Sequence, residues 1–184
     1  MANEKKIDYV LLGLLSHEPL SGYEIKKRLD SSISFFWGAS FGSIYPCLQH
    51  LEKEEKIKST RSQDTGREKI IYEITPLGLA YLKDWLQKPV VKDELRYETL
   101  LKLFFGGKVG PTITLEHIKA FEDKFKDSLD HIKESVNVLE QIDSEVDHLY
   151  FRLTALFAVK TFEAYLEWCK EVKEYLIKEG EKNV

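Results

Sequence analysis

The side chains best suited to reading another molecule lie on one face of the segment SFGSIYPCLQHLEKEEKI, residues 40–57. On a helix, the apolar residues of this segment recur at intervals of three and four and form one stripe. The opposite face is small and polar at its N-terminal end, so its first turns can enter a DNA groove and exchange hydrogen bonds with base edges. The residues predicted to face the major groove are Ser40, Gly42, Ser43, Pro46, Gln49 and His50. The pattern alone is also typical of an ordinary amphipathic core helix, so the flanking sequence has to distinguish the two.

Basic and aromatic residues on either side of this segment are candidates for contacts with phosphate. Residues 1–88 contain 13 lysines and arginines against 12 acidic residues, whereas residues 89–184 contain 14 against 19. The basic residues of the first half are clustered, as expected for a surface that holds the DNA backbone without reading its sequence. We predict that this group consists of Ser21, Tyr23, Lys26, Tyr45, Arg61, Arg67 and Lys69. A solvated charged surface is the alternative for each cluster taken separately.

Three helices should position these residues. Apolar periodicity predicts a first helix over residues 7–15. Ser21 and Glu24 form a capping-box pattern that opens a second helix through about Ser31. Ser40 can cap the third helix, although Pro46 then lies deep inside it. A proline there conflicts with the carbonyl group four residues earlier, so this helix is either bent at its start or regular only from about residue 43.

A β-hairpin follows, because the apolar period changes from about 3.6 to 2 after residue 57. Strands are predicted over residues 57–62 and 69–75, with turn chemistry at residues 63–66. A lone hairpin is marginal in water, so it should lean on the helices and project Arg67 at its tip. Thr75 followed by proline then marks the start of a further helix, which Pro89 closes.

The chain resembles the PadR family of transcriptional regulators in the motifs LLGLLSHEPLSGYEIKKRL, FGSIYPCLQHLEKEEKI, GREKIIYEITPLGLAYLKDWL and ELRYETLLKLFFGG. The resemblance implies a dimeric regulator, usually a repressor, with an N-terminal winged helix and a helical part that pairs the subunits. Glu55 departs from the family, which usually has glycine in the loop after the recognition helix. The expected fold is therefore mainly α: a winged helix-turn-helix in residues 1–88 and a C-terminal helical dimerisation domain in residues 89–184.

The second half reads as helices without comparable motifs. Asp93 can cap a helix through Phe105, with the glycines at 106–107 taking the C-terminal role that favours positive φ. Thr114 can cap a long helix that runs to about Ile142, and a last helix is expected over residues 144–178.

The apolar stripes of these long helices are too extensive for one pair to bury, which predicts a subunit interface. The residues expected to form it are Ile118, Phe121, Phe125, Leu153, Leu156, Phe157 and Val159. A self-contained helical hairpin is the alternative. An aromatic set could also line a pocket for a small effector, although such a stripe is more often core. Its members are Phe157, Phe162, Tyr165 and Trp168.

The sequence does not indicate a secreted protein, a membrane protein or an enzyme. With 43% hydrophobic and 32% charged residues, the 184-residue chain reads as a globular protein of the cytoplasm, with neither a secretion signal nor an apolar run of membrane-spanning length. Cys47 and Cys169 read as buried, reduced thiols. The histidines and carboxylates show no metal-ligand or catalytic spacing, so neither a metal, a cofactor nor an enzyme is expected.

These observations predict a homodimer that binds a near-palindromic site in double-stranded DNA to control transcription. A winged-helix adaptor that binds another protein is the alternative.

Overall fold

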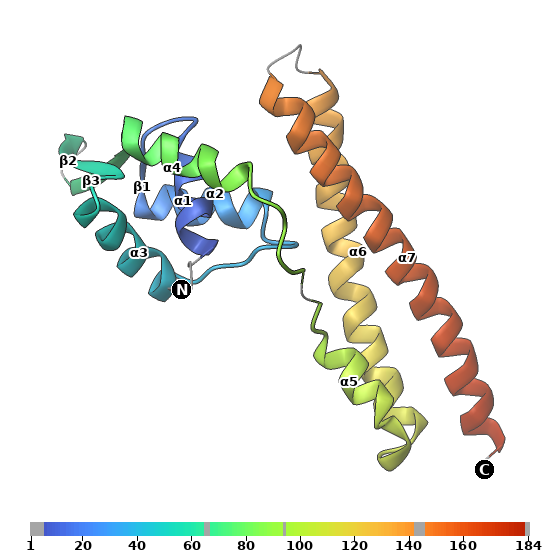
Figure 1. The fold of residues 1–184 in the computed structure, drawn as a ribbon. Coiled ribbons are helices and arrows are strands. Elements are labelled where there is room, and N and C mark those ends of the chain that lie inside the picture. The colour runs from blue at the N-terminus through green and yellow to red at the C-terminus, as the bar shows by residue number, and fades with distance from the viewer. Residues whose placement is uncertain (1–5, 65–66, 94, 142–145, 183–184) are drawn as a thin grey trace. The chain divides into compact units, whose positions relative to one another are not determined.

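The computed structural model describes residues 6–64, 67–93, 95–141 and 146–182, and the chain divides into two compact units, residues 1–93 and residues 94–184 (Figure 1). The first unit has the element order of a winged helix. Its elements are α1 (Lys6–Leu15), β1 (Leu20–Ser21), α2 (Gly22–Ser32), α3 (Phe41–Lys53), β2 (Ile57–Asp64), β3 (Arg67–Ile74) and α4 (Pro76–Leu86). The predicted fold class, mainly helical with a winged helix, is confirmed.

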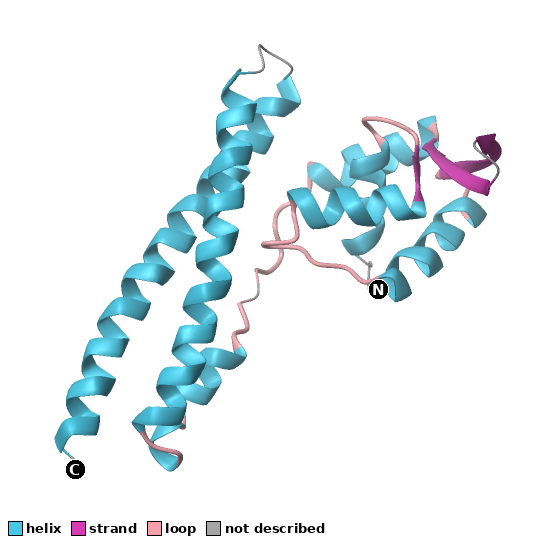
Figure 2. Cartoon of the chain, turned by 180° about the vertical axis from the view of Figure 1, so that it is seen from behind, coloured by secondary structure: helices cyan, strands magenta, loops and turns pink. Residues whose placement is uncertain are grey.

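The sheet contains one strand that periodicity did not reveal. It has the order β1-β3-β2 and is antiparallel throughout, with Leu20 opposite Tyr72 and Ser21 opposite Ile71 (Figure 2). The hairpin strands are longer than predicted, since Gln63 and Asp64 continue β2. Because β1 joins the edge of the hairpin directly before α2, it ties the wing to the start of that helix.

The core of the first unit is built on the apolar face predicted for the third helix. Ile44, Cys47, Leu48 and Leu51 of α3 are all buried, and they belong to the same cluster as the leucines of α1. The ring of Tyr9 stacks on Trp85 of α4 with 4.4 Å between ring centroids, so α4 closes the other side of α1. Burying one face of α3 leaves its polar face at the surface.

Helix α3 begins at Phe41 although it contains Pro46. Of the two outcomes expected for this proline, the later start near residue 43 is therefore wrong. Pro46 cannot donate to the carbonyl of Gly42, but both residues are exposed, so water can take the place of the missing donor. At the start of the helix, the Ser40 N–H donates to Ser43 Oγ at 3.2 Å.

Helix α3 ends just before Glu55, which stands where the family usually has glycine. Glu55 adopts φ +55°, the left-handed region that disfavours side chains with a Cβ atom. The Lys56 N–H donates to the Leu51 carbonyl at 2.9 Å and the Glu55 N–H to the Glu52 carbonyl at 3.0 Å. These two bonds form a Schellman cap, so α3 ends at Lys53 despite the missing glycine.

Glu55→Gly should consequently stabilise the first unit by about 1 kcal/mol, because glycine adopts positive φ without steric cost. Urea unfolding at neutral pH measures the change. Glu54→Gly is the matched control, since Glu54 has an ordinary φ of −84° and glycine there should destabilise. Equal effects of both substitutions would show that the left-handed conformation of Glu55 costs nothing.

The second unit contains a short helix followed by a long helical hairpin. Its elements are α5 (Glu98–Phe104), the 3-10 turn η1 (Gly106–Lys108), α6 (Pro111–Gln141) and α7 (Val146–Lys182). Helices α6 and α7 lie side by side in both views (Figures 1 and 2). No helix in the described ranges is long and apolar enough to cross a membrane.

Three helix ends in this unit differ from the predictions. Helix α5 begins at Glu98 with Tyr97 as its N-cap, so Asp93 does not cap it. Gly106 and Gly107 form η1, and the positive φ (+84°) belongs to Gly110 instead. Thr114 is buried one turn inside α6 and its hydroxyl donates to the Gly110 carbonyl at 2.9 Å. The reason for the last difference is Pro111, which is well suited to the first helical position.

The α6–α7 hairpin buries most of the residues predicted to join subunits. Ile118, Phe121, Phe125 and Val159 are at most 8% exposed, so they form the core of the hairpin and leave no surface for a partner. The expectation that one pair of helices could not hide this stripe was wrong for these four residues. In contrast, Leu153 is 51% and Phe157 65% exposed, and Leu156 is half-buried.

Candidate nucleic-acid interface

The outer face of α3 presents most of the residues predicted to read bases. Ser40, Gly42, Pro46, Gln49 and His50 are exposed. Ser43 is half-buried and its hydroxyl donates to the Ser40 carbonyl at 2.8 Å, so it serves the helix start. Because the opposite face of α3 is locked into the core, these side chains are held on a rigid element.

His50 lies beside a carboxylate that the sequence pattern did not single out. Its Nε2 atom is 3.9 Å from Oδ2 of Asp8, a residue of the first turn of α1 that is 7% exposed. The other oxygen of Asp8 is buried without a hydrogen-bond partner in the described part of the chain. The exposed ring of His50 therefore lies beside a largely buried carboxylate at the outer face of α3.

Tyr45 is held where α3 meets the start of α2. A Cβ atom added to Gly22 would lie 2.8 Å from Cε1 of the Tyr45 ring, so glycine at this position makes room for it. Phe41 stacks on the same ring with 6.2 Å between centroids. Tyr45 nevertheless remains 45% exposed, which leaves it available at the edge of the α3 face.

The wing is joined to α2 by the carboxylate of Glu24. One oxygen accepts hydrogen bonds from the Ser21 N–H at 2.8 Å and the Ser21 hydroxyl at 2.7 Å, and the other accepts one from Lys69 Nζ at 2.7 Å. Ser21 is only 4% exposed and caps α2, so its side chain does not face the surface as predicted. Lys69 is exposed, but its amine is already paired with the Glu24 carboxylate.

These bonds hold the pKa of Glu24 at about 2, chiefly through the hydrogen bond from Lys69 and then through those from Ser21. A lowered carboxyl pKa stabilises the folded state above the unfolded value of about 4.5, and this contribution is lost as the pH falls towards 2. Glu24→Gln should thus lower the free energy of unfolding at pH 7, and the difference from the wild type should shrink towards pH 2. Urea titrations at pH 7 and pH 3 measure it, and a difference independent of pH would contradict the assignment.

The remaining predicted phosphate contacts are distributed over α2 and the wing. Tyr23 is 66% exposed, and Lys26 forms an ion pair with Asp30 while its amine lies 5.9 Å from the centroid of the Phe41 ring. Arg61 is exposed on β2. Arg67 begins β3, and its side chain lies outside what the structure describes.

Among the described residues, no three histidine, cysteine, aspartate or glutamate side chains lie together in a way that could hold a metal ion. Cys47 and Cys169 are both buried, and burial raises the pKa of the Cys169 thiol to about 11. The predicted effector residues Phe162, Tyr165 and Trp168 pack against Phe121 and Phe125, with Phe162 buried and the other two half-buried.

Comparison with known proteins covers both units. Residues 11–84 match the model of the transcriptional regulator PadR-like family, and residues 95–176 match the model called virulence activator alpha C-term. The negative transcriptional regulator PadR of Bacillus subtilis is 34% identical over 125 residues, a match that covers 67% of this chain but only 65% of that protein. A probable transcriptional regulator of Mycobacterium tuberculosis is 25% identical, and the match covers 92% of this chain and 97% of that protein. The crystal structure of Bacillus subtilis PadR in complex with operator DNA has a TM-score of 0.78 and 26% identity, and covers 94% of this chain and 99% of that one.

Proposed function

The chain belongs to the PadR-like family of transcriptional regulators, and on that premise we propose that it binds double-stranded DNA sequence-specifically, as a homodimer that represses transcription. Residues 1–88 would bind DNA and residues 89–184 would pair the subunits. The observation that carries the proposal is the exposed polar face of α3 beside the wing. The relative crystallised with operator DNA supports it, and transcriptional regulation is not an enzymatic function. A protein-binding adaptor is not favoured by these relatives.

Base reading is assigned to the middle of α3. Gln49 carries an amide that can donate to and accept from one adenine edge at the same time, and His50 offers a ring nitrogen one position further along. Both side chains are exposed, as are Pro46 and Gly42, and the lack of a side chain at Gly42 lets the backbone approach the groove. Exposed positions at intervals of four, three and one along one helix suit the recognition of a half-site.

Backbone binding is assigned to the elements that flank α3. Tyr23 and Lys26 lie on α2, and Arg61, Arg67 and Lys69 lie on the wing strands. Such contacts fix the register of a protein on the duplex without reading sequence, and they make affinity dependent on salt. The chain as a whole has a net charge of −4, so attraction to DNA has to come from this local group.

The homodimer is assigned to α7, which exposes apolar residues at intervals of four. Leu149, Leu153 and Phe157 are 49%, 51% and 65% exposed, and residues spaced this way lie along one face of a helix. A second copy of the chain would cover this stripe by two-fold symmetry. Two recognition helices held about 34–36 Å apart would match a near-palindromic operator.

Gln49→Ala should reduce discrimination at a single base pair by about 1–3 kcal/mol, because one bidentate contact is lost. The operator is first located by gel shift with fragments of the protein's own upstream region. Affinities are then measured for operator variants that differ at one position each. Gln141→Ala at the end of α6 is the matched control and should change nothing. A loss that is equal across all variants would mean that Gln49 does not read a base.

A further inference from the structure

Asp8, in the first turn of α1, is a carboxylate that is only 7% exposed. Its Oδ1 atom is buried and has no hydrogen-bond partner in the part of the chain that the structure describes. Its Oδ2 atom lies 3.9 Å from Nε2 of His50. The dipole of α1 favours an acidic residue in this turn, but it explains neither the burial of the carboxylate nor its approach to α3. Because a buried carboxylate without hydrogen bonds costs free energy, this one marks a place where the fold gives up stability.

The backbone positions of Asp8 and His50 are fixed by the core. Tyr9, which follows Asp8, is 2% exposed, and Leu51, which follows His50, is 0% exposed. The His50 carbonyl accepts the Glu54 N–H at 3.0 Å, which holds the last turn of α3. The distance between Nε2 and Oδ2 exceeds that of a hydrogen bond by about 1 Å. A small change in the side-chain torsions of His50 closes this gap and leaves the ring at the outer face of α3.

The position of the ring hydrogen decides what His50 can recognise. A neutral imidazole carries a hydrogen on one nitrogen and a lone pair on the other, and the partner of one nitrogen fixes the state of both. An ionised carboxylate can only accept a hydrogen bond, so Asp8 favours the tautomer with the hydrogen on Nε2. The Nδ1 atom is then a bare acceptor, and its lone pair points away from the Nε2–H bond.

Resting on the proposed function, we propose that Asp8 is a positioning residue that holds His50 in the Nε2–H tautomer, so that Nδ1 accepts a hydrogen bond from an exocyclic amine of the operator. In the major groove these amines are N4 of cytosine and N6 of adenine, whereas guanine and thymine present keto oxygens. His50 therefore selects the strand that carries cytosine or adenine at its base pair. Bound DNA excludes water from the pair, which strengthens the attraction between the Nε2–H group and Asp8.

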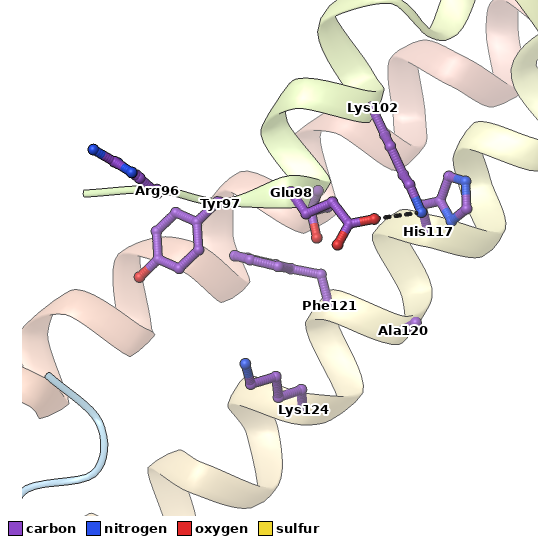
Figure 3. Close-up of a pocket in the computed structure, with 9 residues that line it drawn as sticks. Arg96, Tyr97, Glu98, Lys102, His117, Ala120, Phe121 and Lys124 are labelled. Atoms are coloured by element: carbon purple, nitrogen blue, oxygen red, sulfur yellow. Dashed lines mark ion pairs between the residues drawn. The ribbon is translucent and has the colours of Figure 1, made fainter. Parts of the chain in front are cut away.

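His117 in the second unit provides a matched comparison. It lies near the carboxylate of Glu98, but that carboxylate is exposed and forms an ion pair with Lys102 at 2.9 Å (Figure 3). A carboxylate that is solvated and paired gains little from an imidazole N–H. Glu98→Gln consequently removes a carboxylate beside a histidine without touching α3, and it serves as the control for Asp8→Asn.

The tautomer is measured first, on the full-length chain without DNA. NMR of isotope-labelled imidazole nitrogens distinguishes the two forms, at about pH 8.5, where histidine side chains are in general neutral. We expect the Nε2–H form of His50 to dominate, and Asp8→Asn, whose amide both donates and accepts, to admit the Nδ1–H form. Glu98→Gln should leave the His50 signals unchanged. The same tautomer balance in the wild type and in Asp8→Asn would overturn the role of Asp8.

The base contact is measured with the operator located by gel shift. Each adenine or cytosine is replaced in turn by the same base without its amine. At one position the wild type should lose about fivefold in affinity, whereas His50→Ala should lose nothing further there. Asp8→Asn should reduce that fivefold loss to about twofold, and should change nothing at this base when His50→Ala is already present, because Asp8 acts through the ring. A purely structural role of Asp8 would instead lower affinity for all duplexes alike.

These results separate the His50 contact from DNA binding in general. If the operator is bound specifically but no amine distinguishes the wild type from His50→Ala, the base contact is refuted and sequence recognition rests on other residues of α3. If the chain binds no DNA, the proposed function is refuted together with the base contact. The NMR measurement still decides in that case whether Asp8 fixes the ring hydrogen, because it is made without DNA.

Discussion

Phe157→Asp should dissociate the proposed homodimer and lower affinity for the full operator by about a hundredfold or more. Phe157 is 65% exposed at the end of the apolar stripe of α7, and a carboxylate there would be buried without a partner at a subunit interface. A single winged helix makes few base contacts, so losing the second one removes the gain from binding two half-sites together. Sedimentation velocity and operator titration on the same preparation measure both effects.

Val138→Asp is the matched control for this substitution. Val138 is 54% exposed on α6, outside the α7 stripe, and aspartate there should leave both the oligomeric state and operator affinity near those of the wild type. If Phe157→Asp still sediments as a dimer and binds the operator undiminished, the α7 stripe does not join subunits and its occupant is another molecule.

Gly78→Ala should destabilise the first unit by about 3 kcal/mol, although alanine normally favours a helix. A Cβ atom at Gly78 would lie 2.0 Å from the carbonyl oxygen of Lys56. That carbonyl already accepts the Thr75 N–H at 3.0 Å, and the Thr75 hydroxyl caps α4 by accepting the Gly78 N–H at 3.1 Å. The added methyl group therefore has to separate α4 from the start of β2.

Gly13→Ala should have the opposite effect on the stability of the first unit. Gly13 lies inside α1, and nothing would come within 4 Å of a Cβ atom added there. This substitution should stabilise the unit by about 0.5–1 kcal/mol through helix propensity alone. Differential scanning calorimetry of the two variants compares them directly. A similar rise in Tm for both would show that the close approach at Gly78 is relaxed without cost.

The helix starts that could be predicted from the sequence are those whose capping residues lie close together in the chain. Ser21 with Glu24, and Thr75 with Pro76, were identified as helix starts because each cap is formed within one turn. The start of α6 was missed because two cap signals compete there, and the proline at residue 111 prevails over Thr114. Strand β1 was missed because two residues cannot show a period.

The candidate interface was predictable only in part, for a related reason. The period of α3 separates buried from exposed positions, so Gln49 and His50 were placed on the outer face. In contrast, the contacts of Glu24 with Lys69, Asp8 with His50, and Gly22 with Tyr45 join residues that are far apart in the chain. Such contacts depend on how the helices pack, and no local pattern encodes that.

The α6–α7 hairpin shows the same limit in its apolar stripes. Phe121 and Phe157 have similar periodic settings, yet one is 7% and the other 65% exposed. Hydrophobic spacing indicates that one face of a helix is apolar. It does not tell whether the same chain or a second copy buries that face.

Sequence-specific DNA binding is tested most directly by titrating the full-length chain into two labelled duplexes at one fixed salt concentration. One duplex carries the fragment of the upstream region selected by gel shift, and the other has the same bases in scrambled order. We expect binding to the selected fragment to be tighter by a factor of about a thousand or more. Equal affinity for the two duplexes would contradict sequence recognition by α3 and, with it, sequence-specific DNA binding by this chain.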